Sequence, residues 1–316
     1  MSTMNNLKLK KAMILIFVTV LTGGSNSMVW GQNKDTKKVS YIDKYVPQNA
    51  REEADMMASR AGIACIYRDW QTNSDPSNGQ FMRGYNIGSV MIDWNDTSIA
   101  YALNCVGCFN NGTQHGEVRV MQQYSFCTGN YYLENCTIYT NLEECAMCAG
   151  MMSLEKVPLT IYAQHDPCFG GALQRLLLNS KSLPGGYPPY PRVTKPVASK
   201  LDFYQAINNA YAQYCGSGDV CNCNIVAFLA SSQAQMLYSN ETNKFLAYTP
   251  IFAENQTLQE AFLLLYELIQ PSNGSCDNVP LPIDPSCMPV YFMSKGSLTG
   301  KKIGNTYMVQ RIKKNQ

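Results

Sequence analysis

Helix-type and strand-type patterns alternate through the middle of this chain, and their order restricts the folds open to it. A helical pattern over 48–67 is followed by strand patterns over 87–93 and 98–104, which an Asn-Asp turn joins. Further segments then alternate: helix 115–126, strand 136–142, helix 143–155, strand 158–164, helix 170–180, strand 192–197 and helix 200–214. Because helical crossovers make the later strands parallel, this order predicts an α/β fold, a three-layer α/β/α sandwich around a mixed five-stranded sheet.

The C-terminal hundred residues show a different pattern. Strand-like runs over 224–230 and 234–239 precede an apolar helix over 258–269 and a strand-like tail. No motif in this part indicates chemistry. We therefore predict an α/β domain over 49–216 and a C-terminal α+β extension of unknown role over 217–316.

The N-terminus has the pattern of an export signal. Three lysines, Lys8, Lys10 and Lys11, precede the apolar run AMILIFVTVL at 12–21, which is shorter than a typical membrane span. We predict a signal peptide over 1–31 and an N-terminal arm over 32–48, with an uncleaved anchor as the alternative. The protein is then expected to be secreted, periplasmic or extracellular, without stable membrane insertion after cleavage.

Charge gives little support to a nucleic-acid or membrane partner. Only 15% of the residues are charged and the formal net charge is +2. A nucleic-acid-binding surface needs a dense basic patch, and no such stripe is present in the sequence. Nucleic acid is therefore the less favoured partner.

Export also changes how the 13 cysteines are interpreted. In an oxidising compartment most cysteines pair. We expect the local pairs Cys127–Cys136 and Cys276–Cys287. Cys105 and Cys108 form either a small loop of their own or bonds elsewhere.

Two separated motifs carry residues typical of a catalytic zinc site. His115 begins one predicted helix, and Cys145 and Cys148 lie three residues apart at the start of another. Three protein ligands leave the fourth zinc position open for water. Glu117, two residues after His115, is placed to transfer a proton beside that position without binding the metal. A Cys-x-x-Cys pair alone more often forms a disulfide, but the upstream His-x-Glu favours Zn²⁺.

The segments HGEV and TNLEECAMCAGMM resemble the zinc-dependent cytidine/deoxycytidylate deaminase superfamily, and specifically its tRNA-adenosine deaminase and guanine deaminase branch. YAQHDPCFGGA and the strand that ends in YALNCV also match that branch. The resemblance covers roughly 50–215 and implies His115, Cys145 and Cys148 as zinc ligands and Glu117 as the proton shuttle.

The same resemblance suggests three substrate-binding residues, Asn104, Gly116 and Glu144. Gly116 stands where the family usually has alanine, and Glu144 stands where it has proline. A glutamate at this position would add negative charge near the metal if its side chain pointed inward. Dimerisation is common in the superfamily, so a homodimer is also an expectation.

These observations together predict a zinc-dependent hydrolase that removes the amine from a nucleobase. A free base or nucleoside of the adenine, guanine or cytosine type is the favoured substrate. Two alternatives remain: an exported nucleic-acid deaminase such as a toxin or effector, and a catalytically inactive binding protein with the same fold.

Overall fold

The computed structural model describes residues 43–72, 83–272, 276, 293–294, 297–298, 300–303 and 306–309. Residues Ile42–Gln316 form one compact unit. The predicted signal peptide over 1–31 and most of the predicted arm over 32–48 lie outside the described residues. In the part of the chain that is described, no helix combines the length and the apolar character needed to cross a membrane.

The predicted alternation of helices and strands is confirmed. The elements up to residue 215 are α2 (Ala50–Arg68), β1 (Gly88–Asp93), β2 (Ser98–Leu103), α3 (Val106–Phe109), α4 (Gly116–Thr128), β3 (Cys136–Thr140), α5 (Ala146–Leu154), β4 (Leu159–Tyr162), α6 (Ala172–Leu176), β5 (Lys195–Ala198) and α7 (Asp202–Cys215). The short helix α3 was not predicted. α6 is shorter than the predicted 170–180.

The strands form a mixed sheet, as predicted. β1 pairs antiparallel with β2 and β3, whereas β3, β4 and β5 are parallel to one another. Two further strands, β8 (Gly300–Ile303) and β9 (Thr306–Val309), extend the five predicted ones, because β9 pairs antiparallel with β2. The strand order is β5-β4-β3-β1-β2-β9-β8.

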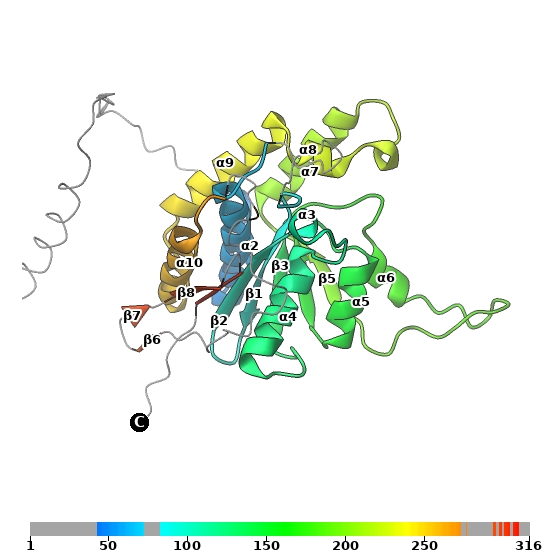
Figure 1. Ribbon diagram of the computed structural model, residues 1–316, viewed down its shortest axis with the longest axis horizontal. Helices are drawn as coiled ribbons and strands as arrows, with labels where there is room; N and C mark the ends of the chain where they lie inside the picture. Colours follow the sequence, from blue (N-terminus) through cyan, green and yellow to red (C-terminus); the bar gives the residue numbers. More distant parts are fainter. Residues whose placement is uncertain are drawn as a thin grey trace, which may run out of the picture. The chain divides into compact units, whose positions relative to one another are not determined.

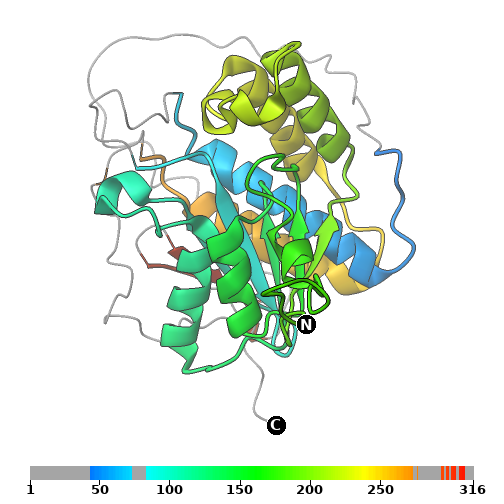
Figure 2. The ribbon, with the colours of Figure 1, turned by 90° about the vertical axis from the view of Figure 1, so that its right-hand side faces the viewer.

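Helices cover both faces of this sheet (Figures 1 and 2). Successive strand residues point to opposite faces, so each strand contributes to two separate cores. In β1, Val90 and Ile92 belong to the core under α2, and Met91 belongs to the core under α4 and α5. The alternation of apolar residues in β1 and β2 therefore accounts for the two helical layers.

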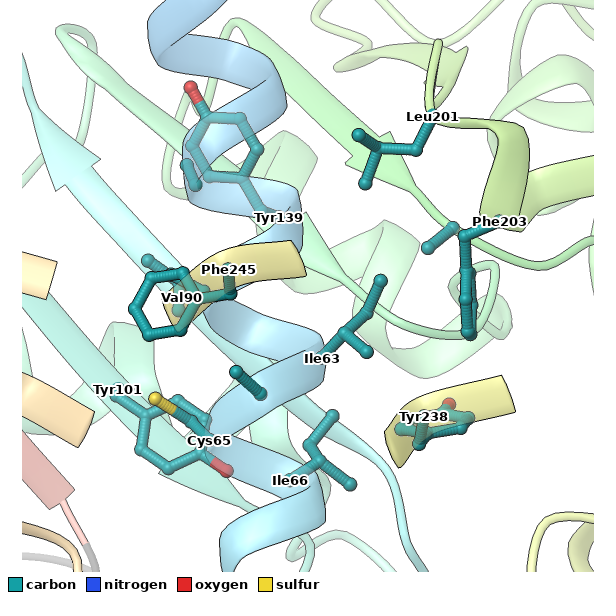
Figure 3. Close-up of a cluster of buried hydrophobic side chains, with 14 of the residues drawn as sticks. Ile63, Cys65, Ile66, Val90, Tyr101, Tyr139, Leu201, Phe203, Tyr238 and Phe245 are labelled. Atoms are coloured by element: carbon teal, nitrogen blue, oxygen red, sulfur yellow. The ribbon is translucent and has the colours of Figure 1, made fainter. Parts of the chain in front are cut away.

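Helix α2 is buried nearly all around, with Ala58, Ala61 and Ala64 at zero exposure. The side chain of Asn49 caps its first turn by accepting a hydrogen bond from the Glu52 amide at 2.9 Å, a type of cap that contributes about 1 kcal/mol. Ile63 and Ile66 of α2 meet Val90 and Tyr101 of the sheet, and Tyr238 and Phe245 come from the C-terminal part (Figure 3).

The C-terminal part thus supplies an additional layer. It contains η2 (Val220–Asn222), α8 (Ile225–Phe228), α9 (Ser232–Ala247), η3 (Ala253–Asn255), α10 (Gln256–Leu268) and the two short strands β6 (Met293–Ser294) and β7 (Ser297–Leu298). α9 and α10 pack against α2. A buried ionic cluster joins α9 to α2, because the Arg60 Nε donates to Glu241 at 2.6 Å and Lys244 lies 3.1 Å from the same carboxylate.

The strand predictions over 224–230 and 234–239 are wrong, because these runs fall mainly in α8 and α9. Asn224 and Ser231 cap the two helices, with side-chain oxygens that accept from the amides three residues later. The buried residues of α9 include Ala234, Tyr238 and Phe245, a helical spacing that covers α2. The apolar helix predicted over 258–269 and the strand-like tail are both present.

Both predicted disulfides are wrong. Cys136 is a buried free thiol in β3, and Cys276 bonds to Cys108. Cys108 therefore pairs elsewhere and not with Cys105, which stays a buried thiol. A second disulfide joins Cys215 to Cys223 across the end of α7.

The start of α4 approaches the sheet closely at Gly116. A Cβ there would lie 2.9 Å from the Ala102 carbonyl oxygen and 2.9 Å from the Gly88 Cα, both of them backbone atoms. We expect Gly116→Ala to lower the free energy of unfolding by about 1–3 kcal/mol, measured by denaturant titration, because α4 must move outward.

Gly150 in α5 is the matched control, since no atom lies within 4 Å of the site its Cβ would occupy. Gly150→Ala should raise the free energy of unfolding by about 0.5–1 kcal/mol through helix propensity. Equal effects of the two substitutions would contradict the close contact at Gly116.

Candidate metal centre

The starts of α4 and α5 bring three metal-ligating side chains together. His115 is the N-cap residue of α4, Cys145 is the N-cap of α5, and Cys148 lies in the first turn of α5. Their ligand atoms all lie within 4.8 Å of one another, and they form the one such group of three found among the described residues. The predicted convergence of the His-x-Glu and Cys-x-x-Cys motifs is therefore confirmed.

The distances within this group fit a tetrahedral zinc ion. Nδ1 of His115 lies 3.7 Å from the Cys145 Sγ and 3.5 Å from the Cys148 Sγ, and the two sulfurs are 3.7 Å apart. Zn–S bonds of about 2.3 Å and a Zn–N bond of about 2.0 Å predict tetrahedral edges of roughly 3.5–3.8 Å. The sulfurs are not joined by a disulfide. Three ligands leave one corner of the tetrahedron open.

Electrostatics of the group also suit a cation. The hydrogen bond with Cys148, and then the neighbouring His115 ring, lower the pKa of Cys145 to about 4, although burial opposes this shift. The same hydrogen bond and burial raise the pKa of Cys148. Burial acts to lower the pKa of His115, but Cys145 and Glu117 raise it overall. The two thiols thus share one proton, which a bound zinc would displace.

Glu117 lies in the first turn of α4 and is 2% exposed. Its Oε1 accepts a weak hydrogen bond from the Thr140 hydroxyl at 3.4 Å. Its Oε2 is buried and has no hydrogen-bond partner among the described residues. Burial raises the pKa of Glu117. A carboxyl oxygen is therefore left available at the edge of the metal group.

The metal group opens into a cavity of about 620 Å³, within the usual range of small-molecule sites. Its walls are largely apolar and aromatic, with the carboxylates of Glu117, Glu143 and Asp166 among them. The lining residues are Tyr85, Ile87, Gly112, His115, Glu117, Leu142, Glu143, Cys145, Met147, Asp166, Cys168, Phe169, Cys221, Asn222, Cys223, Asn224, Ile225 and Val226. None of these residues is a lysine or an arginine.

Glu143 was not singled out by the sequence analysis, yet it organises the turn after β4. Its Oε1 accepts from the Gly171 amide at 2.9 Å, and its Oε2 accepts from the Asp166 amide at 3.2 Å and bonds the His165 ring. The one available signal was its place beside Glu144 in the LEEC motif. Asp166 in turn accepts from the Cys168 and Phe169 amides and so caps this turn.

The predicted substrate-binding residues lie near this cavity but do not line it. Asn104 is fully buried, and its Oδ1 accepts from the Tyr85 and Val106 amides at 3.2 Å. Gly116 contacts the sheet. Glu144 is 1% exposed, and burial raises its pKa to about 8, so this carboxyl is largely protonated at neutral pH. The extra negative charge considered for Glu144 is thereby reduced.

The C-terminal wall of the cavity was also missed. Cys221, Asn222, Asn224, Ile225 and Val226 belong to the part in which the sequence showed no chemical motif. Asn86 links this part to the sheet, since its Nδ2 donates to the Leu229 carbonyl at 3.0 Å. No periodicity or motif could have signalled these contacts, because they depend on how α8 and α9 dock.

Comparison with known proteins agrees with this geometry. Residues 77–168 match the family model for the cytidine and deoxycytidylate deaminase zinc-binding region. The chain is similar to tRNA-specific adenosine deaminase 2 of Xenopus laevis, with 32% identity over 31% of this chain and 59% of that protein. It is 34% identical to the tRNA-specific adenosine deaminase of Bacillus subtilis over 29% of this chain and 57% of that one. The chain thus spans under two thirds of each relative.

Solved structures give weaker similarities. A tRNA:A34 deaminase structure matches 36% of this chain and 78% of its own, at 24% identity and a TM-score of 0.30. Guanine deaminase of Bacillus subtilis matches 32% of this chain and 64% of its own, at 26% identity and a TM-score of 0.26.

The matched segment contains all three clustered ligands and Glu117. Residues 77–168 are therefore similar to the zinc-binding region of cytidine and deoxycytidylate deaminases, and the clustered ligands lie within that similarity.

Proposed function

We propose that this protein catalyses zinc-dependent hydrolytic deamination of a free nucleobase or nucleoside. The observation that carries the proposal is the buried Oε2 of Glu117, which has no hydrogen-bond partner among the described residues, together with a three-ligand metal group that shares its cavity. Water replaces the amine on the ring carbon, and ammonia leaves. The deaminase domain we propose extends over 49–216.

His115, Cys145 and Cys148 would hold the zinc, which lowers the pKa of water and so supplies a nucleophile at neutral pH. Glu117 would accept a proton from that water on its free Oε2. The same oxygen would return the proton to the ring nitrogen, and a second transfer would reach the departing amine. The weak Thr140 contact engages Oε1, whereas Oε2 has no hydrogen-bond partner among the described residues.

The walls of the cavity support a small, uncharged substrate. Tyr85 and Phe169 offer aromatic faces on which a base can stack, and Ile87, Leu142 and Ile225 exclude water. Among the described lining residues there is no lysine or arginine to bind the charged phosphates of a nucleotide or nucleic acid, and the starts of α4 and α5 are taken by the metal-ligating residues His115 and Cys145. These features favour a base or nucleoside over a nucleotide or nucleic acid.

Export remains part of the proposal. The apolar run at 12–21 motivates it, and the disulfides Cys108–Cys276 and Cys215–Cys223 are typical of oxidising compartments. A homodimer stays a prediction from the sequence resemblance.

Ammonia release by the purified protein, measured across a panel of bases, nucleosides and single-stranded oligonucleotides, tests the proposed function. Turnover of a base or nucleoside supports it. Turnover of oligonucleotides alone would identify a nucleic-acid deaminase. Zinc-loaded protein that is inactive on the whole panel would favour a non-catalytic role.

Glu117→Gln should lower kcat by about 10²–10⁴-fold while the zinc content stays unchanged, because the amide cannot carry the proton. Steady-state ammonia release and metal analysis on the same sample measure both quantities. Glu134→Gln is the control, since this carboxylate is exposed and pairs only with Lys156 in the described structure. Undiminished turnover by the Glu117 variant would contradict the assigned role.

Cys148→Ser should weaken zinc binding by at least about tenfold, because it removes a thiolate ligand. Competition with a chromogenic chelator measures the affinity. Cys136→Ala is the matched control, because Cys136 is also a buried free thiol but lies outside the metal group. Equal zinc affinities in the two variants would show that the metal group is assigned wrongly.

A further inference from the structure

Two free thiols face each other at the rim of the cavity. Cys168 lies in the turn after β4, and Cys221 lies in η2 of the C-terminal part. The Cys168 thiol donates to the Val220 carbonyl at 3.8 Å, and the Cys221 thiol donates to the Pro167 carbonyl at 3.3 Å. Each thiol thus contacts the backbone of the residue that precedes the other cysteine. Both cysteines line the cavity.

The turn that carries Cys168 is held in place by buried carboxylates. Asp166 Oδ1 accepts from the Cys168 amide at 2.9 Å and from the Phe169 amide at 2.9 Å. Glu143 binds the Asp166 and Gly171 amides from below. The position of Cys168 is therefore fixed independently of Cys221.

The segment that carries Cys221 is held just as firmly. The Cys215–Cys223 disulfide closes the loop around it. The Tyr211 hydroxyl bonds the Val220 carbonyl at 3.0 Å and the Cys223 carbonyl at 2.8 Å, and Asp219 Oδ1 accepts from the Cys221 amide at 3.0 Å. Two anchored segments that already meet lose little conformational entropy when a covalent bond joins them.

We propose that Cys168 and Cys221 are a disulfide site that ties the end of the zinc-binding domain to the C-terminal wall of the cavity. The oxidant is a small-molecule disulfide, by thiol–disulfide exchange. One protein thiolate attacks it and releases a first small thiol, and the second protein thiolate then displaces the other. Two protein thiols lose two protons and two electrons, and one disulfide becomes two thiols.

The exposures of the two residues suggest the order of attack. Cys221 is exposed, so a small oxidant reaches it first. Burial, followed by the adjacent Cys221 thiol, raises the pKa of Cys168 to about 12, so Cys168 is the poorer first attacker and its low thiolate fraction is offset only by its proximity to Cys221 in the second, intramolecular step. A metal site is a weaker explanation, because neither cysteine belongs to the three-ligand group found among the described residues.

The bond would fix the outer wall of the cavity. Phe169 follows Cys168 directly, and Asn222, Asn224 and Ile225 follow Cys221. Holding these two segments together would keep the wall at a fixed position relative to the metal group. This consequence for substrate binding rests on the proposed function, whereas the disulfide itself does not.

Peptide mapping without reduction tests the bond directly. The full chain is equilibrated with excess oxidised glutathione, the remaining thiols are blocked with iodoacetamide, and the protein is digested. We expect a peptide pair that joins Cys168 to Cys221. Alkylation of both residues, or a bond from either to another cysteine, would overturn the proposal.

Melting temperatures of the oxidised Cys168→Ser, Cys221→Ser and double variants provide a second test. Each should melt about 5–10 °C below the unsubstituted protein, and the double variant should melt no lower than the singles, because all three lack the same bond. Additive shifts in melting temperature, or no shift, would contradict the proposed disulfide.

If turnover is observed, the variants should raise KM and keep kcat, whereas an inactive parent would count against the proposed function alone.

Discussion

The architecture of the site depends on two helices, α4 and α5, whose N-termini lie at the same end of β1. His115 caps the start of α4, which follows β2 through the loop that contains α3. Cys145 caps the start of α5, which follows β3 after a short loop. β1 lies between β2 and β3 and is antiparallel to both, so the two strands finish, and the two helices start, at the Gly88 end of β1. The exposed amides and the dipole of each helix start favour thiolate and bound anionic groups. A shift of either helix would separate the imidazole from the sulfurs, and the close contact of α4 with the backbone at Gly88 limits such a shift.

The C-terminal part contacts two regions of the molecule: α9 and α10 pack on α2, and residues 221–226 line the cavity. α9 and α10 bury the outer surface of α2, and the Arg60–Glu241 pair compensates the charge that this burial encloses. Breaking such a pair costs about 3–5 kcal/mol, since one charge then remains buried alone. Asn141 extends the linkage towards the cavity by donating to the Tyr238 hydroxyl at 2.6 Å. The same segment therefore stabilises the sheet and builds one wall of the cavity.

Sequence reasoning succeeded where the determining interactions are local. The strands over 88–93 and 98–103 and the helix after His115 follow from alternation and helical spacing, and the metal ligands follow from two short motifs. It failed for 224–230 and 234–239: Ile225 and Val226 favour a strand locally, but the caps at Asn224 and Ser231 and the packing of α9 on α2 select helices. It also failed for Cys108–Cys276, whose partners are 168 residues apart, because no local pattern encodes a distant disulfide.

One wall of the cavity lies outside the segment that is similar to known deaminases. The segment similar to the family ends at Cys168, and it holds the metal ligands and Glu117. Cys221–Val226, which face the same cavity, lie beyond that segment. The cavity is therefore built from both parts of the chain: Tyr85, Ile87 and Leu142 lie within the similar segment, and the wall over 221–226 lies outside it. The wall over 221–226 meets the turn after β4 where the Cys221 thiol donates to the Pro167 carbonyl at 3.3 Å, and its side chains are neutral amides, aliphatic groups and the sulfurs of Cys221 and Cys223. Such a surface discriminates by shape and by a few hydrogen bonds rather than by charge.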